Sequence, residues 1–403
     1  MLSWIMIRIS RREFAGAAAL LSASPLRAKT KISIDETLKN GIERRKIPCV
    51  TAMVADSHRV LYHGAFGARD AASGTPVKID SIFSIASMTK AITSFAAVQL
   101  VEAKKVSLDE PVEKYLPELR GRQVLNGFAA DGKARLRPPS KPVTLRHLLT
   151  HTSGLCYDLW EPEMVKWRAS PGVTPTTPAP LMFESGSRWQ YGQGIDFAGR
   201  LIETISGLSL EDYFQKHILV PLRMEDTSFI LPPAKFERLV SNYRRQPDGA
   251  LTQNERKQPN PPTAFNGGGG LYSTAPDYIR FAQAILQRGA GLVKRETFKL
   301  LATNQIGNIR AGFMKSTTPA VSSDVDIHPG EFDHHTLGFV VNPKPHKGGR
   351  AAGSLAWAGI SNTFYWIDPA RNRCAVIMMQ FQPFVDREAV GLLEEFERAV
   401  YSA

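Results

Sequence analysis

Cysteine is scarce in this sequence, which has three in 403 residues. Cys49, Cys156 and Cys374 lie far apart, with neither a C-x-x-C pair nor the Cys and His spacing of a zinc site. A scaffold held by several disulfides is therefore excluded, because three thiols form one bond at most. We expect three buried free thiols and no resident metal or other cofactor.

Long apolar runs are missing too. After residue 28, no segment approaches the roughly 20 strongly apolar residues that a membrane-spanning helix needs. We therefore expect no stable membrane insertion of the mature chain. With 43% hydrophobic and 22% charged residues, the chain has the composition of a folded globular protein.

A concentrated basic surface is a third absence. The formal net charge is +12, yet Lys and Arg are scattered and form neither a basic helix nor a patch interleaved with aromatic residues. We therefore expect a small-molecule partner and no nucleic acid.

Several functional motifs are absent as well. The sequence has no G-x-S-x-G elbow of an α/β-hydrolase, no G-x-G-x-x-G dinucleotide motif and no Walker loop. One acidic loop contains His328, Asp333, His334 and His335, but it lacks the helical or strand spacing that would preorganise a metal site. We interpret this loop as structural, and likewise His151, which lies in a predicted turn.

The N-terminus carries a distinct pattern. Ser10-Arg11-Arg12-Glu13-Phe14 precedes a small-residue apolar run, Ala15–Ala23, and then Ala28. This segment resembles a twin-arginine export signal. We expect residues 1–28 to be removed and the mature protein to be periplasmic or secreted. The alternative is an N-terminal helix that stays in the cytoplasm.

Both ends of the remaining chain combine helices with paired strands. Apolar periodicity predicts helices over 35–45 and 386–401. Strand-like runs on either side of short turns predict antiparallel hairpins over 50–66 and 363–381.

The middle of the chain has a helical pattern. Proline-rich stretches separate the helices that periodicity predicts, which cover 88–103, 144–150, 195–205 and 210–218. Ser209 with Asp212, and Thr274 with Asp277, fit the capping box at a helix start.

Together these patterns predict an α+β fold, in which an antiparallel sheet is flanked by N- and C-terminal helices and interrupted by a large all-helical insertion. Residues 29–86 would form the first part of an α/β subdomain and residues 265–403 its second part. Residues 87–264 would form a mainly helical subdomain between them. We expect a cleft where the two subdomains meet.

The chemistry centres on Ser87-Met88-Thr89-Lys90, the single S-x-x-K of the chain, at the head of a predicted helix. Residues three apart on a helix share a face, so the lysine amine lies beside the serine hydroxyl. A serine hydroxyl is a weak nucleophile and needs such a base. The start of a helix also directs backbone amides toward an oxyanion.

The surrounding segment, Ile82 to Lys90, resembles the active-site segment of class C β-lactamases and of the related family VIII carboxylesterases. Further segments resemble that family in the same order along the chain: a helix-to-turn segment over 144–155, a tyrosine motif over 189–199, a glycine-rich stretch over 267–274 and a third motif over 353–360. The resemblance implies the fold of the serine β-lactamases and penicillin-binding proteins.

The resemblance also implies roles for individual residues. Ser87 would be the nucleophile, Lys90 and Tyr191 would share proton transfer, and the backbone amides of Ser87 and Ile360 would form the oxyanion hole.

Two positions depart from the β-lactamase pattern. Gln193 stands where the tyrosine motif has asparagine, and Trp357-Ala358-Gly359 replaces a motif of Lys or His, then Thr or Ser, then Gly. This version resembles the Trp-Gly-Gly of the esterase branch, with Ala358 in place of the middle glycine. We expect these four residues to contact substrate, with Trp357 as an apolar wall in place of a cation for a substrate carboxylate.

The leading functional hypothesis is a serine hydrolase that cleaves carboxylic esters through an acyl-enzyme on Ser87. The alternatives are a β-lactamase or D-amino-acid peptidase or transpeptidase, and an acyltransferase that uses the same intermediate. A catalytically inactive binding protein is an alternative of another class, against which the presence of Ser87, Lys90 and Tyr191 argues.

Overall fold

The computed structural model describes residues 33–402. The predicted export signal, residues 1–28, lies outside the described residues. Within residues 33–402, no helix is long and apolar enough to cross a membrane.

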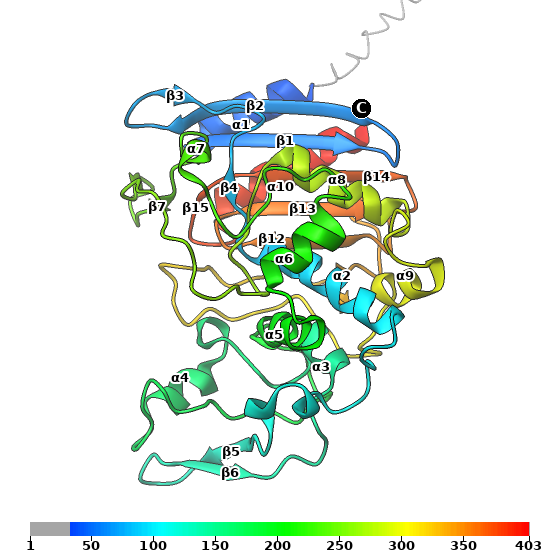
Figure 1. Cartoon of the computed structure of the whole chain (residues 1–403). Coiled ribbons are helices and arrows are strands. Elements are labelled where there is room, and N and C mark those ends of the chain that lie inside the picture. Colours follow the sequence, from blue (N-terminus) through cyan, green and yellow to red (C-terminus); the bar gives the residue numbers. More distant parts are fainter. Residues whose placement is uncertain (1–32, 403) are drawn as a thin grey trace, which may run out of the picture.

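An eight-stranded antiparallel sheet forms the centre of the upper part of the molecule in Figure 1, in the order β10-β11-β12-β13-β14-β1-β2-β3. The sheet joins the two ends of the chain, because β1 pairs with β14, with Thr51 opposite Met378. The two predicted hairpins are confirmed as β1–β2 and β13–β14. The strands are β1 Cys49–Ala55, β2 Val60–Asp70, β3 Thr75–Pro76, β10 His334–His335, β11 Val340–Val341, β12 Leu355–Gly359, β13 Thr363–Asp368 and β14 Arg373–Met378.

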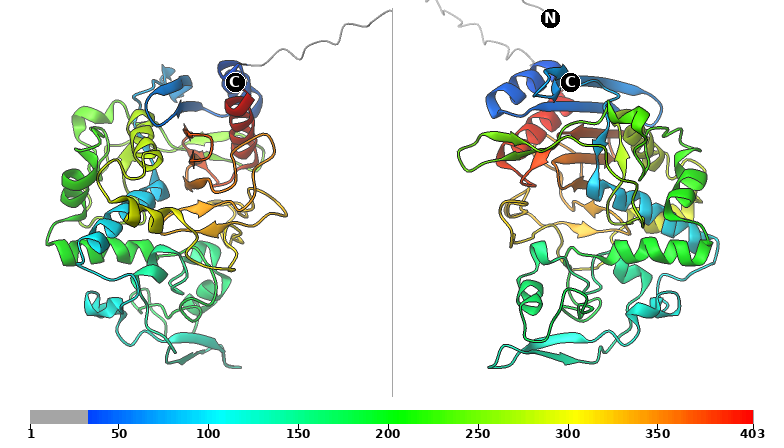
Figure 2. Two further views of the ribbon diagram at one scale, coloured as in Figure 1. Left: turned by 90° about the vertical axis from the view of Figure 1, so that its right-hand side faces the viewer. Right: turned by 60° about the vertical axis from the view of Figure 1, so that its left-hand side comes forward.

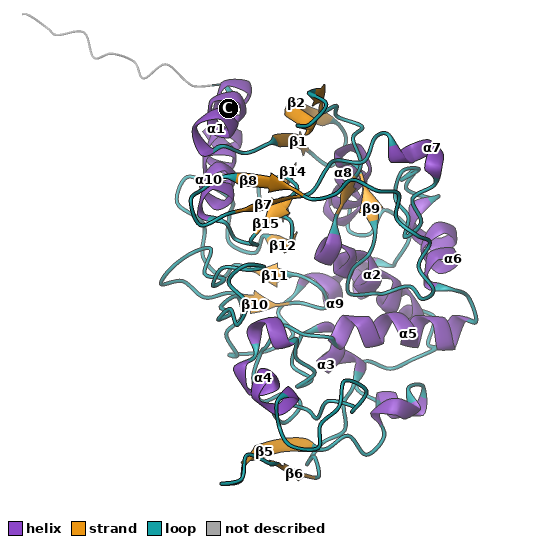
Figure 3. Cartoon of the chain, turned by 90° about the vertical axis from the view of Figure 1, so that its left-hand side faces the viewer, coloured by secondary structure: helices purple, strands orange, loops and turns teal. Residues whose placement is uncertain are grey.

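Helices cover both faces of this sheet. Figure 3 shows α1 (Ile34–Arg45) and α10 (Arg387–Ser402) on one side of the strands, with α8 (Ala275–Leu286) and α2 (Thr89–Glu102) on the other. Alternate residues of a strand face opposite sides, so Trp366 packs in the core on the α1–α10 side and Tyr365 in the core on the α2–α8 side.

The two terminal helices lie side by side, as both views of Figure 2 show. A capping box between Ser33 and Glu36 starts α1. Arg45, near its end, forms ion pairs of 2.8 Å and 2.7 Å with Glu388 and Glu395 of α10. The predicted flanking of the sheet by N- and C-terminal helices is confirmed.

The insertion carries most of the remaining helices. The helix starts predicted at Ser209, before α6, and at Thr274, before α8, are confirmed, because each hydroxyl accepts a hydrogen bond from the backbone amide three residues later. The helices are α3 Leu145–Leu149, α4 Pro162–Arg168, α5 Gly194–Ser206, α6 Leu210–Phe214, α7 Pro233–Phe236 and, farther along the chain, α9 Arg295–Ala302.

The insertion is not entirely helical, which corrects one part of the prediction. Two hairpins interrupt it, β5 (Val124–Phe128) with β6 (Ala134–Arg137) and β7 (Tyr243–Arg245) with β8 (Leu251–Gln253). Both turn at an Asp-Gly pair whose glycine, Gly132 or Gly249, has φ of 81° or 82°. Such a pair is the hairpin signal that the helical reading overlooked. The subdomain boundaries at residues 86 and 264 stay predictions.

Three two-residue strands belong to smaller, separate sheets. β4 Phe83–Ser84 pairs with β9 Tyr272–Ser273, and β15 Phe381–Gln382 runs parallel to β7 of the insertion. All three cysteines are buried and free, as predicted.

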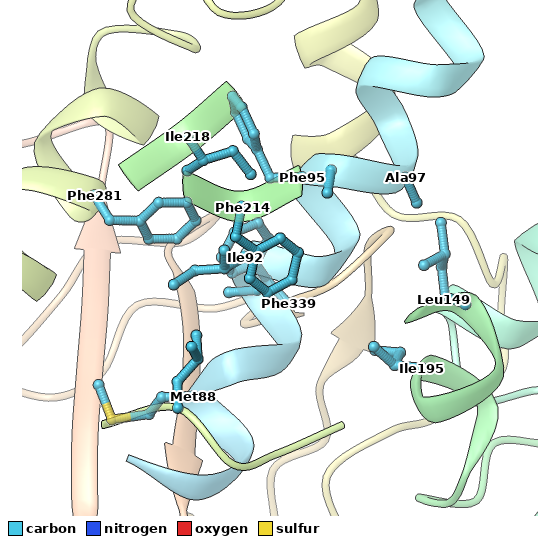
Figure 4. Close-up of a cluster of buried hydrophobic side chains, with 14 of the residues drawn as sticks. Met88, Ile92, Phe95, Ala97, Leu149, Ile195, Phe214, Ile218, Phe281 and Phe339 are labelled. Carbon is cyan, nitrogen blue, oxygen red and sulfur yellow. The ribbon is translucent and has the colours of Figure 1, made fainter. Parts of the chain in front are cut away.

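α2 lies at the junction between the sheet and the insertion. Figure 4 shows Ile92 and Phe95 of this helix packed among apolar side chains that include Phe214 and Phe281. The helix is buried almost all round, as expected for one that is apolar on every face. Its first turn is therefore held rigidly where the two parts of the molecule meet.

Candidate active site

Ser87 lies in a short 3-10 turn, Ala86–Met88, that leads directly into α2. Ala86, just before it, has φ of 43°, a left-handed conformation that is strained for a residue with a side chain. The backbone is fixed there by a 3.0 Å bond from the Ile85 amide to the Leu271 carbonyl. Met88 is buried while Ser87 is only partly so, which leaves the serine hydroxyl accessible at the junction.

Lys90 follows one helical turn later, and its side chain is 2% exposed. Its Nζ donates to three oxygens, at 3.3 Å to Ser87 Oγ, 3.4 Å to the Tyr157 hydroxyl and 2.5 Å to the Gly268 carbonyl. These contacts hold the Lys90 amino group beside the Ser87 hydroxyl. The predicted pairing of Ser87 with Lys90 is therefore present in the structure.

Tyr191 is also 2% exposed, and the face of its ring lies against the amino group of Lys90. Lys90 Nζ lies 4.8 Å from the centroid of the Tyr191 ring, within range of a cation–π interaction. The Tyr191 hydroxyl accepts a 3.3 Å hydrogen bond from Trp357 Nε1. The buried ring of His151 packs 4.6 Å from the Tyr191 ring, centroid to centroid.

Sequence reasoning missed two residues of this cluster. Tyr157 receives the hydrogen bond from Lys90 and donates one of 2.5 Å to Asp196 Oδ2. Burial, together with the charge of Asp196, raises the pKa of Tyr157 well above its ordinary value, so Tyr157 stays a neutral phenol. The Asp196 carboxylate packs against Gly268, and a Cβ at that position would collide with it. Tyr157 follows the segment over 144–155 and Asp196 lies within the tyrosine motif over 189–199, but no spacing rule singles out either residue.

The third motif reaches the site through β12. A Cβ on Gly359 would collide with the carbonyl oxygen of Ile85, so this glycine allows the end of β12 to touch the backbone just before Ser87. Within residues 33–402, neither the Ser87 amide nor the Ile360 amide donates to a recorded acceptor. The oxyanion hole formed by these two amides stays a prediction.

The other residues predicted to contact substrate lie in different surroundings. Trp357 lies against Tyr191, with ring centroids 4.9 Å apart. Ala358, the next residue, is 4% exposed and packs in the core on the α1–α10 side, so its predicted contact with substrate stays a prediction. Gln193 is the residue before α5, where its amide bonds to the Leu155 carbonyl at 2.8 Å. No hydrogen bond of its side chain is recorded in the described chain.

The histidine side chains of the loop over 328–335 make separate contacts. His334 bonds to the Ile309 carbonyl, His335 bonds to the Thr336 carbonyl, and the His328 ring lies tilted against that of His346, with centroids 3.8 Å apart. Among the described residues, no group of three or more His, Cys, Asp or Glu side chains is placed to hold a metal ion.

With this geometry established, comparison with known proteins identifies the family. A family profile described as Beta-lactamase matches residues 34–397. The chain belongs to the beta-lactamase family. The resemblance of the motifs and the predicted fold class are thereby confirmed, and the chain is an enzyme of this superfamily.

Individual members of this beta-lactamase family resemble the chain over nearly its whole length. Monacolin J acid methylbutanoyltransferase from Aspergillus terreus is 29% identical, with 92% of this chain and 95% of the relative covered. Lovastatin esterase from Penicillium rubens is 31% identical, with 91% and 98% covered. The solved structure of unliganded simvastatin synthase from Aspergillus terreus superimposes with a TM-score of 0.80 at 28% identity, with 92% and 97% covered.

Proposed function

We propose that this enzyme forms an acyl-enzyme on Ser87 from a carboxylic ester and passes the acyl group to an alcohol, with water as a competing acceptor. The observation that carries the proposal is the 3.3 Å contact between Lys90 Nζ and Ser87 Oγ at the head of α2. The sequence alone put hydrolysis first. Of the two relatives compared above, one is named a transferase and the other an esterase, which supports acyl transfer at least as strongly as hydrolysis.

In the first half of the reaction, the Lys90 amine takes the Ser87 proton while Oγ attacks the ester carbonyl carbon. The carbonyl oxygen becomes an oxyanion, to which the amides of Ser87 and Ile360 donate. The bond to the alcohol oxygen then breaks, and the leaving alkoxide takes the proton from Lys90 or through Tyr191. In the second half, an acceptor hydroxyl attacks the acyl carbon, gives its proton back to the same groups, and Ser87 is released.

Tyr157 and Asp196 are positioning residues in this proposal. The phenol offers Lys90 an oxygen to hold while the carboxylate holds the phenol. A lysine fixed by two contacts besides Ser87 stays aligned with the hydroxyl, which is what proton transfer between them requires.

The walls of the site favour an uncharged organic acceptor. The rings of Tyr157, Trp160 and Trp357 all lie within 5.5 Å of the Tyr191 ring, measured between centroids. An apolar alcohol gains contact with such a surface, and water gains little.

The β-lactamase and peptidase alternative lacks a cation for the substrate carboxylate. Trp357 stands at the position of that cation, and Arg350, the nearest candidate upstream, is buried in a bidentate ion pair with Glu397 at 2.5 Å and 3.0 Å. A carboxylate taken from water without a partner is strongly disfavoured. This argument favours esters over β-lactams as substrates.

The test is the partition of products. The enzyme is incubated with 4-nitrophenyl butyrate and increasing butan-1-ol, and butyl butyrate and butyrate are quantified by gas chromatography. The proposal predicts that butyl butyrate dominates at alcohol concentrations far below that of water, and that both products vanish in Ser87→Ala. Butyrate as the sole product would identify a hydrolase, and activity in Ser87→Ala would overturn the mechanism.

A further inference from the structure

A cavity of about 90 Å³ lies beside β12, under the loop that runs from residue 311 to 333. It lies on the α1–α10 side of the sheet, where Ala356, Phe364 and Leu393 contribute to its lining. Ser87, Lys90 and Tyr191 do not line it. The cavity is thus separate from the position where an ester carbonyl meets the serine.

One part of this cavity is apolar. Its lining there includes Val325, Ala356, Trp357 and Phe384. Phe313 is also part of the lining although 61% of it is exposed, so the cavity is bordered by an aromatic ring at the surface. Such a lining suits a hydrocarbon ring or short chain.

The other part is polar, and several of its polar atoms have no hydrogen-bond partner among the described residues. Asn342 is 5% exposed, and its Oδ1 has no hydrogen-bond partner among the described residues. The side chain of His346 is 10% exposed, and neither ring nitrogen has a hydrogen bond there; Nδ1 lies 3.5 Å from Glu397 without hydrogen-bond geometry. Asp333 completes this end, and no hydrogen bond of its carboxyl group is recorded. Buried polar atoms are nearly always satisfied, so this end is suited to a ligand that supplies the missing partners.

The charges at this end disfavour an anionic ligand. Among the described residues, Arg350 is the one Lys or Arg in the lining and already pairs with Glu397, while Asp326 and Glu331 add two exposed carboxylates. Burial lowers the pKa of His328 to about 3, so that imidazole is neutral near pH 7. Burial likewise raises the pKa of Asp333, which makes a further negative charge at this end less favourable. A neutral hydroxyl is the group that these partners fit.

The size of the cavity limits the ligand. One water needs about 10–15 Å³ by the same measure, so 90 Å³ corresponds to about six to nine such positions. A wider surface depression shares Ile327, His328, Glu331 and His346 with the cavity and offers a route of entry.

We propose that this cavity is a second ligand site, which binds a small uncharged alcohol with its hydrocarbon part against Trp357 and its hydroxyl at Asp333, Asn342 and His346. The site communicates with the catalytic cluster through one side chain. Trp357 lines the cavity and donates its indole hydrogen to the Tyr191 hydroxyl, so a ligand against the indole acts on a catalytic group.

The experiment is isothermal titration calorimetry of the protein with cyclohexanol, which has seven non-hydrogen atoms, and with cyclohexanecarboxylate. We expect cyclohexanol to bind at least tenfold more tightly than the carboxylate. Ala356→Leu, which fills the apolar part, should abolish binding, and Asp333→Leu, which keeps a similar volume, should weaken it about tenfold. Circular dichroism melting curves establish that each variant is folded.

Ser87→Ala is the matched control, because it removes the proposed nucleophile but leaves the cavity intact. Cyclohexanol should bind to it as to the unaltered protein, even if the proposed acyl transfer proves wrong. Loss of binding in Ser87→Ala, equal binding of the carboxylate, or unchanged binding in folded Ala356→Leu and Asp333→Leu would overturn the proposal.

Discussion

Tyr157 donates a 2.5 Å hydrogen bond to Asp196, and its oxygen also receives one from Lys90. The phenol is therefore a bridge between the lysine beside Ser87 and a carboxylate on α5. Burial and the charge of Asp196 hold the pKa of Tyr157 well above its ordinary value, so the bridge is protonated near neutral pH.

Removal of this bridge should slow catalysis without weakening substrate binding. In Tyr157→Phe the ring remains but Lys90 loses one acceptor, and we expect kcat on 4-nitrophenyl butyrate to fall about tenfold to a hundredfold, in the range of lost proton-transfer alignment. KM should change by less than about twofold, because the phenol acts on Lys90 and not on the ester. Steady-state kinetics measure both quantities.

Two comparisons separate positioning from a general loss of packing. Tyr213→Phe alters another buried tyrosine, whose hydroxyl has no recorded hydrogen bond in the described chain, and should leave kcat unchanged. Tyr157→Phe combined with Asp196→Asn should be no slower than the slower single variant, because both changes break one chain of contacts. Additive losses would mean that the two residues act independently.

Substrate preference follows from Trp357. An uncharged ester needs no ionic partner beside Trp357. A cephalosporin carries a carboxylate, and Arg350 cannot pair with it because Arg350 is already bonded to Glu397. A loss of about 3 kcal/mol in pairing corresponds to more than a hundredfold in rate at about 1.4 kcal/mol for each factor of ten. We therefore predict kcat/KM for short-chain nitrophenyl esters at least about a hundredfold above that for a chromogenic cephalosporin. Comparable values would refute the preference, and loss of the cephalosporin activity in Lys347→Ala would identify the exposed Lys347 as a substitute cation.

Stability should depend on the buried pair of Arg350 and Glu397. Burial alone would raise the pKa of Glu397, but the charge and hydrogen bonds of Arg350 outweigh it and hold that pKa well below its usual range. The pair therefore stabilises the fold fully above the unfolded pKa of about 4.3 and progressively less as the pH falls below it.

Glu397→Gln leaves a buried guanidinium without its counter-charge and should lower the free energy of unfolding by about 3–5 kcal/mol at pH 7. The difference from the unaltered protein should shrink as the pH is lowered from 5 toward 3 in chemical denaturation. Glu395→Gln, on the same helix but in a more exposed pair with Arg45, should cost about 1 kcal/mol or less. A difference that grows toward low pH would show that the sign of this linkage is wrong.

Export is a proposal that rests on Arg11 and Arg12. Replacement of both by lysine keeps the charge but removes the planar guanidinium groups that a twin-arginine signal presents. We expect the double variant to accumulate in the cytoplasm, as measured by cell fractionation and N-terminal sequencing. Full periplasmic yield of the variant, with Met1 as its N-terminus, would show that residues 1–28 are not such a signal.

The sequence predicted the sheet, its flanking helices and the Ser87–Lys90 pair because each depends on local pattern. Strand alternation, helical periodicity and an i, i+3 spacing are all visible within a few residues. The two Asp-Gly hairpins were equally local and were overlooked because a helical pattern around them dominated the interpretation.

Tyr157, Asp196 and the cavity beside β12 could not be predicted in the same way. Tyr157 and Asp196 are 39 residues apart, and their contact exists only because α5 packs beside the segment that follows α3. The cavity joins Val325, Asp333, Trp357 and Leu393, which come from a loop, a strand and the last helix. Neither arrangement has a period or a spacing, so tertiary packing alone reveals it.

The most direct test of the account is mass spectrometry of the intact protein after brief mixing with 4-nitrophenyl butyrate. The account predicts a mass increase of one butyryl group, located by peptide mapping on Ser87, absent in Ser87→Ala, and discharged faster when butan-1-ol is added. An adduct on another residue, or turnover of the ester by Ser87→Ala at the rate of the unaltered enzyme, would contradict it.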